Sequence, residues 1–173
     1  SKYICFLLMI IPWGVNAQSN YFKIAEARVQ KFGISNKNFA IIIDYTKNIL
    51  QERLYILDLK KANIILSSRV SHAWNSGALY PKMYSNKRGS AMSSKGTFVT
   101  GEKIVSPKFG YSMLVKGLEI GVNNNARVRE IIFHSDARMK TKWSNGCFAT
   151  PEKINNKIID LTNNGTIVCV IDN

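Results

Sequence analysis

Short runs of β-branched and aromatic residues recur along most of this chain, and they constrain its fold more than any other feature. Such residues favour extended backbone, and runs of this length match single strands. The runs lie at 39–45, 54–59, 64–70, 96–100, 111–115, 128–133 and 166–171. The first three follow one another with short connections, which predicts an antiparallel meander. The chain is therefore expected to be mainly β.

Two segments have the periodicity of helices instead. Apolar side chains recur at helical spacing over about 20–32, and Gly33 follows as a stop. A second helix is expected over 151–161, with Thr150 as its cap. Residues 73–95 show no period and are predicted to form a long loop, which often carries function. The expected fold is a mainly β (β-rich α+β) domain of packed or rolled β-sheets with two short flanking helices.

The N-terminus has the layout of a secretory signal peptide. Lys2 precedes the apolar run Tyr3–Ile11, and the small-residue segment Val15–Ala17 follows. The run is about ten residues long, whereas a membrane-spanning helix needs roughly 20. We therefore predict a signal peptide at 1–17, an exported protein of the periplasm, cell envelope or medium, and no stable membrane span after cleavage. The alternative is that the run forms a buried strand or short core helix.

The remaining length fits a single domain. The charge of the chain predicts an anionic partner. The chain has 24 Lys and Arg against 11 Asp and Glu. For an exported protein, anionic wall polymers, lipid headgroups or carboxylate-bearing peptides are nearer than nucleic acid, and no nucleic-acid-binding module is recognisable. A surface that is basic only for solubility is the alternative.

Two cysteines remain once Cys5 leaves with the signal peptide. Cys169 lies in the last β-branched run, which predicts a buried thiol that acts as a small apolar side chain. Cys147 ends the polar, turn-like stretch 143–147, where a thiol is exposed enough to react. A disulfide between the two is the open alternative.

A reactive cysteine needs a base, and His134 is the candidate. It follows an apolar run and should stand at the C-terminal end of a strand, with Cys147 downstream across a polar connection. Gly146 permits a sharp turn that would aim backbone amides near Cys147 at an attacked carbonyl, as in an oxyanion hole. From spacing alone, a core histidine and an incidental thiol remain the alternative.

Further motifs accompany this pair. His134 precedes the segment Ser144-Asn145-Gly146-Cys147. Other motifs occur at 70–72, 86–90, 96–102, 114–119, 123–126 and 129–134. In content and order they resemble those of the L,D-transpeptidase (YkuD-like) catalytic domain family, in its murein L,D-transpeptidase-like branch. The resemblance runs from about residue 39 to 172, which implies a helical lead-in at 18–38 and a catalytic domain at 39–173.

This resemblance implies a two-step acyl transfer on peptidoglycan stem peptides. The Cys147 thiolate would attack the carbonyl of the third residue of a donor tetrapeptide and release the terminal D-alanine, while His134 would take the thiol proton. The backbone carbonyl of Ser135 would orient the imidazole. The amides of Gly146 and Cys147 would hold the oxyanion. An acceptor amine would then give a crosslink, and water would give hydrolysis.

Three residues are expected at the substrate. His72 would hydrogen-bond the substrate, with a structural role at the end of a hairpin as the alternative. Ser144 would support the nucleophile, with turn stabilisation as the alternative. Arg129 is a candidate for binding stem-peptide carboxylates, because a guanidinium group matches a carboxylate in shape. Tyr80, Ser90 and Arg138 are further candidates for that role.

The chain departs from the family pattern at a few positions. Ser135 stands where glycine is frequent, Asn145 replaces a larger residue, Phe148 replaces proline and Ala73 replaces glycine. None of these changes removes the thiol, the imidazole or the glycine before the thiol. They bear on substrate choice more than on the chemistry.

Two other functions stay open. One is a hydrolase, such as an L,D-carboxypeptidase, that uses the same residues; the other is a non-catalytic, basic wall-binding module. No cofactor or metal is expected, because His72 and His134 lie far apart, no Cys-x-x-Cys pair is present and no glycine-rich phosphate loop joins a strand to a helix. The protein is expected to act as a monomer.

Overall fold

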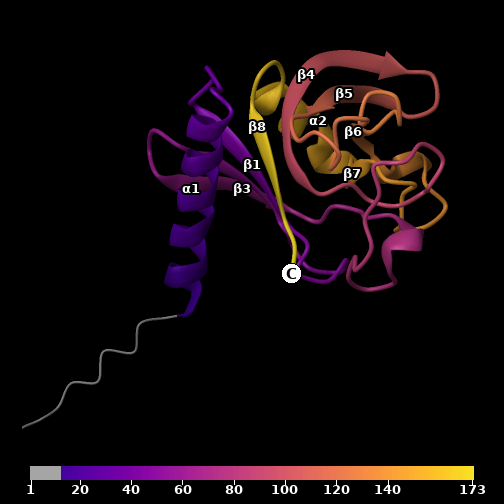
Figure 1. Cartoon of the computed structure of the whole chain (residues 1–173), viewed down its shortest axis with the longest axis horizontal. Coiled ribbons are helices and arrows are strands. Elements are labelled where there is room, and N and C mark those ends of the chain that lie inside the picture. Colours follow the sequence, from indigo (N-terminus) through magenta and orange to yellow (C-terminus); the bar gives the residue numbers. More distant parts are fainter. Residues whose placement is uncertain (1–12) are drawn as a thin grey trace, which may run out of the picture.

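Within residues 13–173, the part of the chain that the structure describes, one eight-stranded sheet curls into a half-barrel with two helices against it (Figure 1). This computed structural model describes side chains from Gln18 onward. In sheet order the strands are β3 (Asn63–Ser68), β2 (Leu54–Asp58), β1 (Phe39–Asp44), β8 (Ile167–Ile171), β4 (Gly96–Ser106), β5 (Gly110–Gly117), β6 (Ile132–Ser135) and β7 (Phe148–Thr150). The mainly β class expected from the sequence is confirmed.

The last strand joins the two halves of the sheet. β1, β2 and β3 form the expected antiparallel meander. β8 then inserts beside β1 in parallel, with Ile42 opposite Cys169, and beside β4 in antiparallel, with Phe98 opposite Val168. β1 and β8 are covered on both faces, and for this reason their sequences are apolar without alternation.

Helix α1 (Trp13–Lys31) lies along one face of this central region (Figure 1). Every second residue of β1, Ala40 and Ile42, packs in the cluster that α1 covers, whereas Ile41 and Ile43 point into the main core on the opposite face. The buried α1 side chains in that cluster are Tyr21, Ala25 and Val29. The helical lead-in is therefore packed against the sheet as part of the same folded unit.

The predicted signal peptide overlaps the start of this helix. Its apolar run, Tyr3–Ile11, lies outside the described residues, so the export signal stays a prediction. The helix begins at Trp13 rather than at the expected Asn20, and it includes the expected cleavage position, Ala17. Cleavage there would leave Tyr21 and the other buried side chains named above in place. None of the helices in residues 13–173 is long and apolar enough to cross a bilayer.

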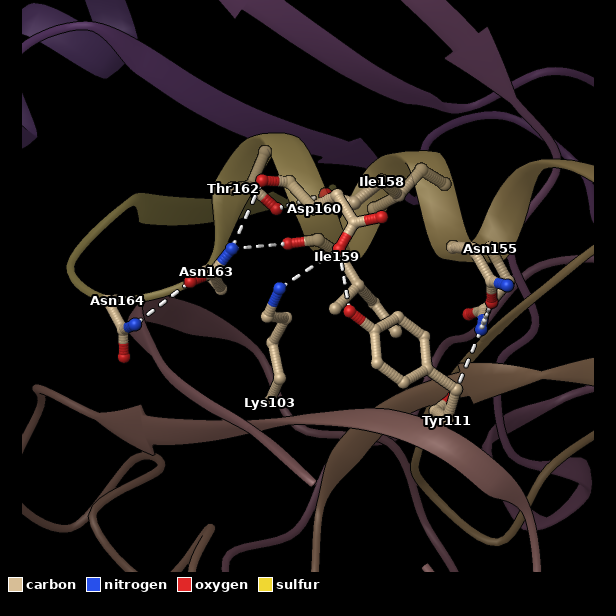
Figure 2. A network of polar contacts seen from close by, with 10 residues as sticks. Lys103, Tyr111, Asn155, Ile158, Ile159, Asp160, Thr162, Asn163 and Asn164 are labelled. Carbon is tan, nitrogen blue, oxygen red and sulfur yellow. Dashed lines mark hydrogen bonds and ion pairs between the residues drawn. The ribbon is translucent and has the colours of Figure 1, made fainter. Parts of the chain in front are cut away.

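Helix α2 (Glu152–Thr162) packs inside the curl of β4 and β5 (Figure 1). Figure 2 shows how polar contacts join the helix to these strands: Asp160 accepts hydrogen bonds from the Tyr111 hydroxyl (2.6 Å) and from the Lys103 ammonium (3.2 Å). The Asn155 amide donates to the Tyr111 carbonyl (3.1 Å). Beneath these bonds Ile158 and Ile159 are fully buried. The helix thus holds the β4–β5 hairpin in place.

Two strands differ from the sequence-based expectation. β6 begins at Ile132 instead of residue 128, because residues 121–130 form turns. β7 was not expected, since a strand of three residues gives almost no pattern. Residues 73–95 form the expected loop, which contains one 3-10 turn (η1, Trp74–Ser76).

The cap predicted for α2 is wrong. Pro151 holds the cap position, where no side-chain cap bond forms, and the Thr150 hydroxyl donates to the Asn155 side chain (3.1 Å) instead. The backbone amide of Glu152 donates to the Asp136 carboxylate (3.2 Å). An acidic side chain from the connection after β6 therefore takes the place of a local cap.

Candidate active site

The pairing of β6 with β7 brings His134 and Cys147 to one face of the sheet. The two strands are parallel, with Phe133 opposite Phe148 and His134 opposite Ala149. Side chains alternate along a strand, so Cys147, two residues before Ala149, lies on the same side as His134. Phe133 and Phe148 enter the core on the other side. The expected position of His134 near the end of a strand is confirmed, with one further strand residue after it.

Both residues line a cleft of about 1040 Å³. Its walls come from the tip of the β4–β5 hairpin, the turns before β6 and the connection from β6 to β7. Of the described residues that line it, five are basic and one, Glu130, is acidic. The basic residues are Lys108, Arg127, Arg129, Arg138 and Lys140. The cleft therefore attracts anionic groups.

The imidazole of His134 is held from two directions. Its Nδ1–H donates to the Ser135 carbonyl (2.7 Å), which leaves Nε2 as the proton acceptor. Phe109, at the tip of the β4–β5 hairpin, stacks on the ring with centroids 3.7 Å apart and planes at 14°. Burial lowers the pKa of His134, and the charge of Lys108 acts in the same direction. The imidazole is therefore neutral near pH 7 and able to accept a proton.

The thiol of Cys147 is half-buried and protonated at rest. Its Sγ donates to the Glu130 carbonyl (3.4 Å) rather than to His134. Burial raises the pKa of the thiol, although the Ile132 amide and the positive charges of Lys108 and Arg129 offset part of that rise. The cleft is thus lined by an imidazole and a thiol that are both uncharged near pH 7.

Gly146 shapes the turn that presents the thiol. Its φ of +126° is rarely adopted by side-chain-bearing residues, and a Cβ there would lie 2.8 Å from the Met92 carbonyl and 2.9 Å from Ile131 Cδ1. The Gly146 amide donates to the Ser144 hydroxyl (3.1 Å), which in turn donates to the Cys147 carbonyl (2.8 Å). These contacts match the turn-stabilising alternative for Ser144. They also engage the Gly146 amide, which was expected to face the oxyanion.

Arg129 fastens the 73–95 loop to the site. Its guanidinium donates to the Met92 carbonyl (2.6 Å), to the Ser94 hydroxyl (2.5 Å) and to the Ser90 hydroxyl (3.2 Å), and also to the Ser85 carbonyl. Four protein partners occupy most of its donors. Arg129 thus presents its charge to the cleft, while its hydrogen bonds hold the loop.

His72 lies in the interior, away from the cleft lining. It is fully buried, and its ring nitrogens contact Arg53 Nη2 (2.8 Å) and the Gly77 carbonyl (2.8 Å). Its own carbonyl accepts from the Ser144 amide (2.9 Å). With both ring nitrogens engaged, His72 has the contacts of the structural alternative: it supports the segment that leads to Gly146 rather than facing substrate.

The remaining candidates separate into those at the cleft and those outside it. Arg138 lines the cleft and donates to the Lys108 carbonyl (3.2 Å), which ties the hairpin tip to the β6–β7 connection. Ser90 is engaged by Arg129, and Tyr80 does not line the cleft. Both described cysteines, Cys147 and Cys169, are free thiols, and Cys169 is fully buried, so the open alternative of a disulfide is excluded.

Three residues at the site were not expected from the sequence. Phe109 and Lys108 sit in the hairpin tip after Pro107, and an aromatic residue in an exposed turn is the signal that was available. Glu130 has a φ of +57°, and this left-handed backbone aims its carbonyl at the thiol. No local pattern marks such a residue.

A family model described as an L,D-transpeptidase catalytic domain matches residues 15–171. The chain belongs to this family. L,D-transpeptidases are cell-wall enzymes that act on peptidoglycan. No curated protein sequence matches the chain.

Solved structures share the L,D-transpeptidase fold at low sequence identity. The cell shape determining protein Pgp2 from Campylobacter jejuni is 12% identical with a TM-score of 0.55, over 94% of this chain and 57% of that one. A fused Zn-dependent amidase/peptidase/peptidoglycan-binding protein from Clostridium acetobutylicum is 17% identical with a TM-score of 0.50, over 88% and 62%. An L,D-transpeptidase from Stackebrandtia nassauensis is 13% identical with a TM-score of 0.49, over 81% and 58%. The chain thus spans about three fifths of these proteins, and its likeness to the first two concerns the fold.

Proposed function

We propose that this protein is a cysteine acyltransferase that crosslinks peptidoglycan stem peptides by L,D-transpeptidation, with Cys147 as nucleophile and His134 as base. The observation that carries the proposal is a neutral, oriented imidazole on the same sheet face as a half-buried thiol, in one basic cleft. Stem peptides carry carboxylates, which suit the positive charge of that cleft. Peptidoglycan lies outside the cytoplasmic membrane, so the proposal requires export.

The first half-reaction forms a thioester. His134 Nε2 takes the proton of the Cys147 thiol, and the sulfur attacks the carbonyl carbon of the third residue of the donor stem. The backbone amide of Cys147 donates to the oxyanion, since the Gly146 amide is engaged by Ser144. The C–N bond to the terminal D-alanine then breaks, and its amine leaves with the proton from His134.

The second half-reaction releases the enzyme. An amine from a neighbouring stem gives a proton to His134 and attacks the thioester carbonyl. The C–S bond breaks, the sulfur recovers a proton from the imidazolium, and a new amide joins the two stems. Ser135 keeps Nδ1 occupied throughout, so that only Nε2 exchanges protons. Water in place of the amine would give a shortened stem and no crosslink.

The test is mass spectrometry of products formed from a tetrapeptide-stem muropeptide. Wild type should release D-alanine and yield a crosslinked dimer, whereas Cys147→Ala should fold and yield neither. Cys169→Ala is the matched control, because it removes the other thiol of residues 13–173 without touching the cleft, and it should keep turnover. Tripeptide without dimer would indicate a hydrolase. No change with any folded, substrate-binding variant would leave a wall-binding module as the better account.

A further inference from the structure

An exposed tryptophan, Trp74, pairs at the cleft with the half-buried Trp143. The rings of Trp74 and Trp143 meet edge to face, with centroids 4.4 Å apart and planes at 77°. Trp74 is 56% exposed, which is unusual for so large an apolar side chain. Exposed apolar surface next to a cleft is a frequent mark of ligand binding.

Hydrogen bonds anchor the Trp143 ring and the backbone of Trp74. The indole N–H of Trp143 donates to the Ala78 carbonyl (2.7 Å), and the Trp74 amide donates to the Ser144 carbonyl (3.3 Å). Lys142 lies over the Trp143 ring at 5.5 Å from its centroid. Trp74 is therefore the member that offers open ring surface. Little ordering remains to be done when a ligand binds, and this favours affinity.

The pair also lies within reach of the reacting groups. Trp143 lines the same cleft as Cys147, and Trp74 bonds to Ser144, whose side chain bonds to the Cys147 carbonyl. Three extended residues span at most about 10–11 Å. If the third residue of a stem is at Cys147, the sugar that carries the stem must lie about that far away, at the rim of the cleft.

We propose that Trp74 and Trp143 form a platform for a pyranose ring of the glycan strand that carries the donor stem. The inference rests on the proposed function and adds a sugar subsite to it. The faces of aromatic rings are electron-rich, and the C–H hydrogens on the flat side of a pyranose are weakly positive, so the two surfaces attract. The exposed amide of Asn145, two residues beyond Trp143, can bond sugar hydroxyl or acetamido groups.

The kinetic test compares two donors, a disaccharide-tetrapeptide and the same tetrapeptide without sugar. In Trp74→Ala, the ratio of kcat/KM for the sugar-bearing donor to that for the bare donor should fall by roughly tenfold. Trp74→Phe should keep most of the wild-type ratio, because phenylalanine also offers an aromatic face. The matched control is Met83→Ala, in the same loop and 54% exposed, which should leave the ratio at the wild-type value. An unchanged ratio in Trp74→Ala, or an equal loss with both donors, would overturn the platform.

A binding measurement separates this inference from the proposed function. Titration of the full chain with an oligomer of N-acetylglucosamine should change tryptophan fluorescence in wild type, and Trp74→Ala should weaken binding by roughly tenfold. The measurement needs no turnover, so it can succeed where the transpeptidase proposal fails. Absence of binding to wild type, or equal binding by Trp74→Ala, would refute the sugar subsite while leaving the catalytic proposal intact.

Discussion

Because Gly146 has no side chain, the backbone has room to make the turn at the thiol. The Met92 carbonyl and Ile131 fill the space that a methyl group would need, and the backbone there has a φ of +126°. The backbone of the 73–95 loop, itself fastened by Arg129, thus forms one wall of the turn. The small size of Gly146 is therefore what allows this turn.

We predict that Gly146→Ala lowers the free energy of unfolding by about 2–4 kcal/mol, from backbone strain together with overpacking. Chemical denaturation measures this change, and turnover should fall with it. Gly121→Ala is the control: Gly121 also has positive φ (+77°), but no atom lies within 4 Å of a Cβ added there. Gly121→Ala should lower the free energy of unfolding by about 1 kcal/mol, from backbone strain alone. Equal costs at the two positions would contradict the steric argument.

The β4–β5 hairpin reaches across the sheet to complete the site. Tyr111 and Lys103 bind its strands to α2 (Figure 2), and Arg138 donates to the Lys108 carbonyl at its tip. This support places Phe109 against the ring of His134. A hairpin anchored on both of its strands and at its tip can keep water from one side of the imidazole.

We predict that Phe109→Ala moves the acid limb of the kcat/KM–pH profile to higher pH. Burial holds the pKa of His134 below its ordinary value, so renewed access of water should raise that pKa. More of the imidazole is then protonated at a given pH and cannot accept the thiol proton, and activity is lost first on the acid side. Phe109→Tyr should keep the stack and the wild-type profile. An equal loss at every pH would mean that Phe109 acts only in folding.

Burial of polar groups outside the cleft makes the stability of the whole protein depend on pH. Arg53 and His72 are both fully buried and joined by a hydrogen bond, and Arg53 also donates to the Val70 carbonyl (2.7 Å). Burial lowers the pKa of His72 to about 4, and the charge of Arg53 adds to the effect. The imidazole stays neutral in the native state while the unfolded chain takes up a proton near its ordinary pKa, about 6.5.

We predict that the free energy of unfolding falls as the pH drops from about 6.5 to about 4. In this window the unfolded state binds more protons than the native state, so stability rises with pH. His134, whose pKa is also lowered, acts in the same direction. Urea denaturation at several pH values measures the slope, which should be shallower in His72→Gln than in wild type. The same slope in both proteins would mean that His72 does not titrate on unfolding.

Local preferences alone were enough to predict most of the elements. The β-branched runs gave the strands and the meander, and the spacing of apolar residues gave both helices, because each depends on neighbours along the chain. The motifs around His134 and Cys147 singled out a candidate pair. Where local pattern was weak, as at β7 and at the start of β6, the prediction failed.

The remaining features depend on contacts between residues distant in the sequence. The insertion of β8 between β1 and β4 is one such feature. Phe109 on His134, the loop held by Arg129 and the burial of His72 beside Arg53 are others. In the last three cases, a side chain with no distinctive sequence pattern acquires its role from the residues that the curled sheet places against it. Burial and charge at the site are properties of that packing, and no single segment encodes them.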